Sequence, residues 1–337
     1  DEFLAEMRRE VFEGREGYMN VGEAPGITPA RNEHVTDPAH KELDMLFLFD
    51  HVGIDQKGSK WNTVPFEVGN LRASLAAQQE AVRDAGWASL FFCNHDQPRV
   101  VSRWGNDTDR ESRELSAKAF GMLLHMHRGT PYIYEGEELG MTNAHFTRLE
   151  QYRDLEAVNA YRQRVEEAKC QSPESMMAAL ALIGRDNSRT PMQWDASRYA
   201  GFTAPDAATE PWISVNPNHV EINAAEEFDD PGSVYTFYKK LIAMRHNNAT
   251  IATGEWNLVA ADSEQVYSFT RTSGDDTILV IVNLTDRTAQ VPAEVAQLLE
   301  DGVGESQVLL STYDAVHSVK SVARGELARW EGVVIQL

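Results

Sequence analysis

Cysteine is scarce in this chain, because only Cys93 and Cys170 occur among its 337 residues. Two cysteines do not make a disulfide framework, so the sequence favours a reducing compartment and a cytoplasmic location. Cys93 lies in an apolar run and is expected to be a small core residue. No group of Cys and His residues has metal-ligand spacing, so we expect neither a metal site nor a cofactor.

Basic residues are also few, with 31 Lys and Arg against 52 Asp and Glu and a formal net charge of −21. This balance argues against nucleic acid, whose phosphates require a basic face, and against anionic membrane surfaces. The sequence has no apolar run long enough to span a membrane and no recognisable signal peptide. A neutral partner such as a sugar suits these charges, but they do not select it.

The first part of the chain alternates between expected strands and helices, which is typical of a parallel sheet. We expect strands at 18–22, 43–49, 90–93 and 131–134, helices at 2–12, 68–85 and 111–127, and a loop at 25–37. A long irregular insert follows at about 140–233, with one helix at 152–170, and then a helix at 234–246. After Gly254 the short β-branched runs predict an antiparallel β module.

Two of the expected strands run into a carboxylate at their carboxyl ends. Glu23 follows the first strand, and His95 and Asp96 follow the strand at 90–93. Active sites of α/β folds lie at this edge of the sheet. Glycoside hydrolysis needs one carboxylic acid to protonate the leaving oxygen and a second carboxylate about 5 Å away as nucleophile, or farther away to activate water. Taken singly, Glu23 is better explained as a loop carboxylate or a cap, and Asp96 is equally well explained as a helix cap.

Four segments favour the catalytic interpretation, and they occur in one order along nearly the whole chain. They are VGEAPG at 21–26, NHDQPRVVSR at 94–103, GTPYIYEGEELGMTN at 129–143 and GRDNSRTPMQW at 184–194. With these segments the chain resembles the alpha-amylase superfamily of glycoside hydrolases, in its oligo-1,6-glucosidase and alpha-glucosidase branch.

The resemblance implies an α/β fold made of the carboxyl-terminal half of a TIM (β/α)8 barrel followed by an antiparallel β-sandwich. Residues 1–250 are then strands 5 to 8 of the barrel, with the insert at 140–233, and residues 254–337 are a C-terminal all-β domain. The family places its nucleophilic Asp on a strand before the one that ends at Glu23. This sequence has no such motif, so we expect the nucleophile upstream of the chain.

The resemblance also implies roles for individual residues in a retaining alpha-glucosidase acting on alpha-1,6 or alpha-1,4 bonds. Glu23 is the candidate general acid/base, which keeps its proton near neutrality if its pocket is enclosed. Asp96 is the candidate stabiliser of the oxocarbenium-like transition state, and His95 contacts the same sugar. Arg189 contacts the sugar or the nucleophile with its planar fork, unless it is only a loop salt bridge. Lys60 lies on the loop that the family uses near the aglycone.

The acidic cluster Glu135, Glu137 and Glu138 is interpreted instead as a solvated or structural loop. Two alternatives to hydrolysis stay open. A sucrose isomerase or transglucosidase of the family carries an Arg-rich loop where this chain reads HVGIDQKG at 51–58, without arginine. A catalytically inactive, amylase-like interaction protein is disfavoured because both Glu23 and Asp96 are retained.

Half a barrel has consequences for the chain by itself. Two strand edges carry unpaired backbone groups, and the apolar face meant for the barrel interior is bared. We expect Leu46, Leu48, Phe91 and Phe92 among the exposed side chains. The chain should therefore either pair its strand edges with another copy or lie beside its own amino-terminal half. It should lack glycosidase activity alone, and the expected substrate of the complete enzyme is an oligosaccharide.

Overall fold

The computed structural model describes residues 2–40, 42–301, 307–313, 322 and 324–337. Its first sheet has strands β1 (Val21–Glu23), β2 (Met45–Phe47), β3 (Ala88–Leu90) and β4 (Thr130–Pro131). The strands lie in the order β1-β2-β3-β4, and each pair is parallel. The sequence predicts four parallel strands in this part of the chain, and the pairing confirms them. Each strand is shorter than expected, and two are displaced, since β3 shares only Leu90 with the predicted strand at 90–93 and β4 only Pro131 with that at 131–134.

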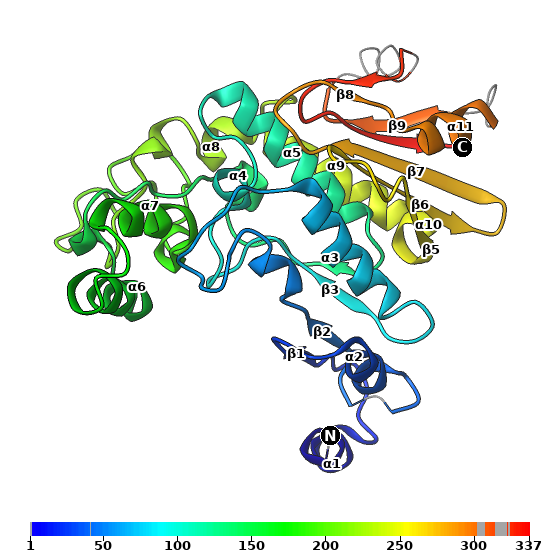
Figure 1. The fold of residues 1–337 in the computed structure, drawn as a ribbon, viewed down its shortest axis with the longest axis horizontal. Coiled ribbons are helices and arrows are strands. Elements are labelled where there is room, and N and C mark those ends of the chain that lie inside the picture. The colour runs from blue at the N-terminus through cyan, green and yellow to red at the C-terminus, as the bar shows by residue number, and fades with distance from the viewer. Residues whose placement is uncertain (1, 41, 302–306, 314–321, 323) are drawn as a thin grey trace.

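Three helices form a layer between this sheet and the C-terminal sheet (Figure 1). They are α3 (Val68–Glu80), α5 (Arg110–Met126) and α9 (Val234–Asn247). Asp109 and Ser233 cap α5 and α9 by accepting hydrogen bonds from Ser112 N and Thr236 N. Their apolar faces share one core with side chains such as Phe92 of the first part and Phe269 of the C-terminal sheet. These helices match the expected ones. The apolar stripe is clear in α5, whereas the buried face of α3 also includes Arg72, Gln78 and Gln79.

The expectation that Leu46, Leu48, Phe91 and Phe92 are exposed is wrong, since each is at most 5% exposed. Leu46 and Leu48, two residues apart, point to the same face of the sheet and pack in the apolar cluster that contains Val35. Phe92 points into the helix layer, where its ring centroid lies 5.6 Å from that of Phe120. Because side chains alternate along a strand, Leu46, Leu48 and Phe92 all lie on the face of the sheet that the helices cover. Half a barrel still has helices on this face.

Phe91 points to the opposite face and is covered by other aromatic side chains. Its ring centroid lies 5.4 Å from those of Phe47 and Phe49 and 4.8 Å from that of His51. Burying a side chain of this kind is worth roughly 1.5–3 kcal/mol. This face is thus partly closed by its own residues.

Residues 25–37, expected as loop, contain the helix α2 (Pro29–Thr36). Pro29 occupies the start of this helix, where its missing N–H costs no hydrogen bond. The expected helix at 2–12 is present as α1 (Glu2–Met7), continued by a π-helical turn at Arg8–Phe12. A short helix α4 (Val100–Arg103) follows β3.

The insert is more ordered than the sequence indicates. Its helices are α6 (Leu155–Tyr161) with a π-helical continuation at Arg162–Glu167, α7 (Pro173–Ile183) and α8 (Ala224–Glu227). It has an apolar cluster of its own, centred on Met176 and Leu180 and including Trp61 from the loop after β2. The insert therefore packs as a unit rather than as a long loop.

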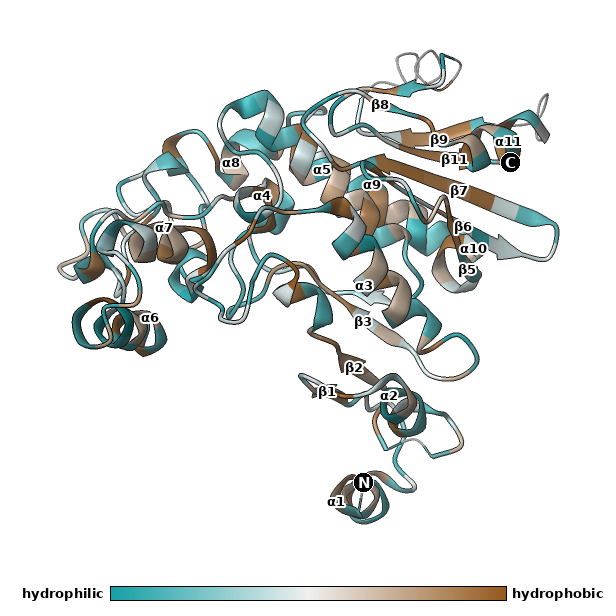
Figure 2. Cartoon of the chain, in the orientation of Figure 1, coloured by the Kyte–Doolittle hydropathy of each residue, from teal (hydrophilic) through white to brown (hydrophobic). Residues whose placement is uncertain are grey.

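After α10 (Ala249–Thr253) comes a five-stranded antiparallel sheet in the order β5-β6-β7-β11-β9. Its strands are β5 (Glu255–Val259), β6 (Val266–Ser273), β7 (Asp276–Asn283), β9 (Gln307–Ser311) and β11 (Gly332–Gln336). One face packs on the helix layer, and the other on α11 (Ala293–Asp301), β8 (Ala289–Gln290) and β10 (Glu326–Leu327). Burial on both faces explains the continuous apolar stretch of β7 in Figure 2.

Candidate active site

The carboxyl ends of the parallel strands open into a pocket of about 240 Å³. The polar groups in its wall are Glu23 after β1 and Asn94 and His95 after β3. The rest of the wall consists of aromatic and small side chains: Phe47, Phe49, Phe91, Cys93, Tyr132, Ile133 and Tyr134. Carboxylate, imidazole and aromatic rings in one concave site are the groups expected around a sugar.

Glu23 lies at the end of the edge strand β1, opposite Phe47 of β2. The preceding Gly22 leaves room for this pairing, because a Cβ there would lie 2.5 Å from Leu46 Cδ2. The Glu23 side chain is exposed, so the described residues do not give it the enclosed pocket that the sequence leads us to expect.

His95 and Asp96 are presented by a tight turn. The Asn94 side-chain oxygen accepts a hydrogen bond from Asp96 N at 2.7 Å, and Gln97 N donates to Asn94 O at 3.2 Å. Beyond Pro98, Arg99 N donates to Asn143 Oδ1 at 3.0 Å. Hydrogen bonds on both sides therefore hold the backbone that carries the catalytic candidate Asp96 and the sugar-binding candidate His95.

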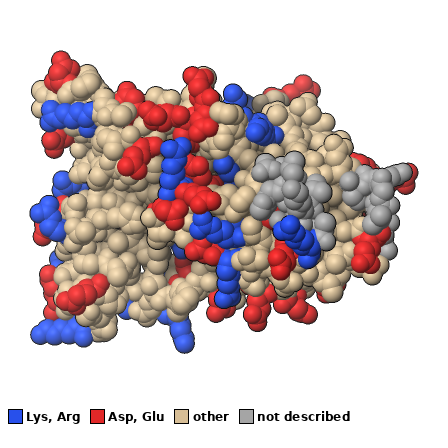
Figure 3. Space-filling view, turned by 90° about the horizontal axis from the view of Figure 1, so that it is seen from above, with Lys and Arg blue, Asp and Glu red and all other residues tan. Residues whose placement is uncertain are grey.

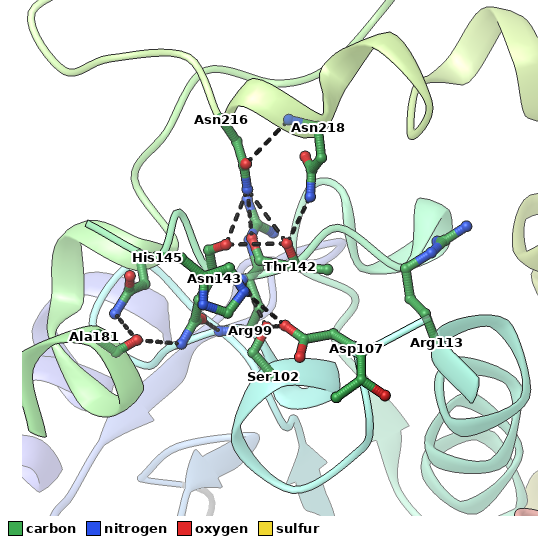
Figure 4. A network of polar contacts seen from close by, with 12 residues as sticks. Arg99, Ser102, Asp107, Arg113, Thr142, Asn143, His145, Ala181, Asn216 and Asn218 are labelled. Carbon is green, nitrogen blue, oxygen red and sulfur yellow. Dashed lines mark hydrogen bonds and ion pairs between the residues drawn. The ribbon is translucent and has the colours of Figure 1, made fainter. Parts of the chain in front are cut away.

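Asn143 connects this turn to the insert (Figure 4). Its Nδ2 donates to Ala181 O and Leu182 O at the end of α7, both at 2.9 Å. The backbone carbonyl of Asn143 accepts a hydrogen bond from Asn216 Nδ2 at 3.0 Å, and its backbone N–H donates to Ser102 Oγ. Asn143 is buried and uses both the donor and the acceptor positions of its amide. Its hydrogen bonds therefore join the turn before Arg99, the end of α7 and the segment at Asn216.

Asp96 lies between two guanidinium groups of the insert. Arg189 Nη2 donates to Asp96 Oδ1 at 2.5 Å, and Arg189 Nε donates to the carbonyl of His95 at 2.7 Å. Arg185 Nη1 lies 3.7 Å from Asp96 Oδ2. Thus the structure brings Asp96, His95 and Arg189 together, as three of the five residues proposed from the sequence.

Lys60 does not line the pocket but joins the same charge network from outside. Its Nζ donates to Glu156 Oε2 at 2.6 Å and lies 5.0 Å from the centre of the Trp61 ring. Glu156 is in turn 2.9 Å from Arg185 Nε. The network therefore runs from Lys60 through Glu156 and Arg185 to Asp96.

Arg185 and Glu156 were not predicted as site residues. The sequence does indicate Arg185, because it lies four residues before Arg189 within one of the four segments. It does not indicate Glu156, since nothing in the sequence shows that α6 packs near the loop after β2. Asp186 is a further missed residue, and its Oδ2 accepts hydrogen bonds from Arg153 N and Asp154 N at the start of α6.

Among the three clustered acids after β4, Glu137 is buried and lies behind the pocket. Tyr238 OH donates to its Oε1 at 3.1 Å, and burial raises the pKa of Glu137 to about 7. Burial also raises the pKa of the neighbouring Cys93 thiol. The structural interpretation of Glu137 fits these contacts, whereas Glu135 is exposed.

Within the described ranges no group of three or more His, Cys, Asp or Glu residues is arranged to hold a metal ion. Across the same ranges, no helix is long and apolar enough to cross a membrane. On the face in Figure 3, acidic side chains are interspersed with Lys and Arg rather than separated from them.

Comparison with known proteins gives consistent matches. The family model for the alpha amylase catalytic domain matches residues 1–254. The chain is 42% identical over 339 residues to an oligo-1,6-glucosidase of Parageobacillus thermoglucosidasius, covering 100% of this chain and 58% of that protein. It is 43% identical over 314 residues to an alpha-glucosidase of Pediococcus pentosaceus, covering 91% and 55%.

Solved structures agree over almost the whole chain. Trehalose-6-phosphate hydrolase of Bacillus licheniformis superposes with a TM-score of 0.88 at 39% identity, over 99% of this chain and 58% of that one. Isomaltulose synthase of Klebsiella sp. LX3 superposes with a TM-score of 0.87 at 31% identity, again over 99% and 58%. The chain therefore spans a little over half the length of the relatives it matches.

Proposed function

The chain belongs to the alpha-amylase family, and on that premise we propose that it supplies part of the active site of a retaining alpha-glucosidase. The substrates are short oligosaccharides with alpha-1,6- or alpha-1,4-glucosidic bonds. The observation that carries this proposal is the pocket at the carboxyl ends of the parallel strands, which Glu23 and His95 share and beside which Asp96 is held.

In this proposal residues 1–250 contribute strands 5 to 8 of a (β/α)8 barrel, and residues 254–337 form the C-terminal domain. That domain is not all-β as the sequence predicts, because it contains the helix α11, and its sheet shares a core with the helix layer. The parallel order β1-β2-β3-β4 supports the first part, because a barrel closes from consecutive parallel strands. The antiparallel sheet after Gly254 supports the second part.

Glu23 acts as the general acid/base. It protonates the glycosidic oxygen as the bond breaks, and afterwards it removes a proton from the water that releases the sugar. The nucleophile is an Asp outside these 337 residues. Its carboxylate must lie about 5 Å from that of Glu23 for retention of configuration. The residues that carry it then also enclose the Glu23 carboxyl, which is exposed in these 337 residues.

Asp96 binds sugar hydroxyls and stabilises the positive charge that develops on the ring. His95 contacts the same sugar from the neighbouring position. Arg189 and Arg185 hold the Asp96 carboxylate in place, so its orientation is set before substrate binds. The aromatic rings of Phe47, Phe49 and Tyr132, which line the pocket and are partly exposed, pack on the apolar faces of the sugar.

The isomerase alternative is less well supported. The loop at 51–58 has no arginine, and its acidic residue Asp55 is buried in an ion pair with Arg103. Asp55 is therefore not available to a bound sugar. Because the chain also matches an isomaltulose synthase, the experiment below includes sucrose as a substrate.

The deciding experiment is a substrate panel for the protein that contains this chain. Isomaltose, maltose, trehalose 6-phosphate and sucrose are each incubated with it, and the products are separated. Release of glucose from isomaltose or maltose supports the proposal. Conversion of sucrose to an isomer without net hydrolysis supports the alternative, and no turnover of any substrate overturns the assignment.

A further inference from the structure

Arg99 follows Asp96 by three residues and is among the largest fully buried side chains of the described residues, with 1% exposure. It does not line the pocket that Glu23 and His95 share. We infer that Arg99 is a positioning residue, which sets the place of Asp96 relative to Arg189. The effect on catalysis rests on the proposed hydrolysis, whereas the geometry itself can be measured without substrate.

The main chain of Arg99 is tied to the insert (Figure 4). Its N–H donates to Asn143 Oδ1 at 3.0 Å, and Asn143 Nδ2 donates to two carbonyls at the end of α7. Pro98, the residue before Arg99, is buried, and its ring fixes the backbone angle φ. The short segment between Asp96 and Arg99 therefore has little freedom to turn Asp96 away.

The guanidinium of Arg99 reaches the segment that carries Arg189. Arg99 Nη2 donates to Ser188 O at 3.3 Å, and Ser188 is joined to Arg189 by a peptide bond. Arg189 Nη2 in turn donates to Asp96 Oδ1 at 2.5 Å. These contacts form a closed path that begins and ends at Asp96, and Arg99 supplies the link opposite the ion pair.

Arg99 also holds the segment after β4, which supplies part of the pocket wall. Its Nη1 donates to Glu135 O, and its Cζ lies 5.1 Å from the centre of the Tyr134 ring. Tyr134 OH donates to the same Ser188 O at 3.1 Å. Among the described residues the guanidinium forms no ion pair and donates to backbone carbonyls alone. Because a carbonyl oxygen belongs to the main chain, these directional bonds set backbone positions.

The planar fork of arginine allows one side chain to bind carbonyls of two different segments. A lysine keeps the positive charge but presents a single ammonium group on a flexible stem. Arg99→Lys should therefore release Ser188 and let Arg189 move away from Asp96. Misplacing a group of the site by about 1 Å can cost about 10²-fold in rate, even when the mutation lies away from the reacting atoms.

The first measurement is proton exchange at Arg189 Nε, followed by NMR in the protein that contains this chain, labelled with ¹⁵N-arginine. This proton is protected because Arg189 Nε donates to His95 O at 2.7 Å. We expect Arg99→Lys to accelerate its exchange about tenfold or more. Arg189→Lys identifies the signal. Tyr134→Phe removes only the second donor to Ser188 O and should accelerate the exchange about threefold, so it serves if Arg99→Lys does not fold.

The matched control is Arg271→Lys. Arg271 is also a fully buried guanidinium that donates to backbone carbonyls, but it lies in the C-terminal sheet. Urea denaturation should show that Arg271→Lys and Arg99→Lys both lose stability. Only Arg99→Lys should change the exchange at Arg189, because Arg271 has no contact with the site.

The second measurement is a double-mutant cycle on kcat/KM for isomaltose. Arg189→Gln alone should lower kcat/KM about tenfold. In the Arg99→Lys background the same change should cost only about twofold, because Arg189 no longer lies against Asp96. In the Arg271→Lys background it should still cost about tenfold. A merely structural role for Arg99 leaves the losses independent of one another.

Two results overturn the inference. One is exchange at Arg189 Nε that is no faster in Arg99→Lys, or in Tyr134→Phe where that variant replaces it, than in Arg271→Lys. The other is a cycle in which the losses from Arg99→Lys and Arg189→Gln multiply independently. Absence of glucoside hydrolysis in the parent protein contradicts the proposed function instead, and the exchange rates then still decide whether Arg99 places Arg189 on Asp96.

Discussion

Arg103 and Asp55 form a bidentate ion pair in which the two side chains are 1% and 2% exposed. Arg103 Nε and Nη2 donate to the two carboxylate oxygens, each at 2.7 Å. The same guanidinium donates to Gln97 Oε1 at 3.0 Å, so the pair joins the loop after β2 to the turn that presents His95 and Asp96.

Removing Asp55 should therefore destabilise the fold strongly. Asp55→Ala leaves the buried Arg103 charge without its counter-ion, which costs about 3–5 kcal/mol in other buried pairs. Urea denaturation measures the free energy of unfolding. The pair Arg110–Glu114, whose arginine side chain is 75% exposed, provides the control, because Arg110→Ala should cost less than about 1 kcal/mol. Equal losses in the two variants contradict the role assigned to the Asp55–Arg103 pair.

Glu23→Gln tests the general acid directly. In the protein that contains this chain, we expect hydrolysis of isomaltose to fall by roughly 10²–10⁴-fold. Aryl alpha-glucosides need little protonation of the leaving group, so their cleavage should fall much less in the glycosylation step. Steady-state kinetics on both substrates decide the matter, and an equal loss on both speaks against a general-acid role.

Arg185→Gln and Lys60→Met compare the two ends of the charge network. Arg185 lies 3.7 Å from Asp96, whereas Lys60 reaches Asp96 only through Glu156 and Arg185. We expect kcat/KM for isomaltose to fall about tenfold or more in Arg185→Gln and only a few-fold in Lys60→Met. The reverse order would place Lys60 in direct contact with the sugar.

Glu137 should make stability depend on pH. Its pKa in the folded state is raised to about 7 by burial, above the ordinary value of 4.5. Between these values the folded state holds a proton that the unfolded state releases, so the free energy of unfolding falls as pH rises from 4.5 to 7. Glu137→Gln should flatten this decline.

The measurement is urea denaturation at several pH values, taken as the difference between each variant and the parent chain. Glu135→Gln is the control, because Glu135 is exposed on the same loop. The difference for Glu137→Gln should favour the variant increasingly up to pH 7. A difference that is constant with pH contradicts a protonated Glu137.

These 337 residues alone are expected to self-associate and to leave an aryl alpha-glucoside intact. The strand β1 lies at the edge of its sheet, Met19 just before it is 62% exposed, and Phe3 of α1 is 81% exposed. Light scattering of the chain should give more than a monomer mass, and Phe3→Glu with Met19→Lys should lower it. Phe228→Ser, at an aromatic exposed by 59% elsewhere, is the control. A monomer that turns over the glucoside refutes this prediction.

Some features followed from contiguous sequence because the physics behind them is local. A strand-like run that turns polar at Glu23 and at Asp96 placed both carboxylates at the carboxyl edge of the sheet, although β3 itself ends at Leu90. The apolar stripe of α5 likewise marked a helix. Both signals depend on neighbours within a few residues. The alternation of such segments then determined the parallel sheet, since parallel strands need a long connection between them.

Only the tertiary structure decided which segments meet and which faces they cover. Periodicity shows that a strand has two faces, but the burial of Leu46 depends on the helix α2, which the sequence did not reveal. Lys60 pairs with Glu156 across 96 positions of the chain, and Arg189 with Asp96 across 93. Ion pairs of this kind leave no periodic trace, because their partners are chosen by packing in three dimensions and not by spacing along the chain.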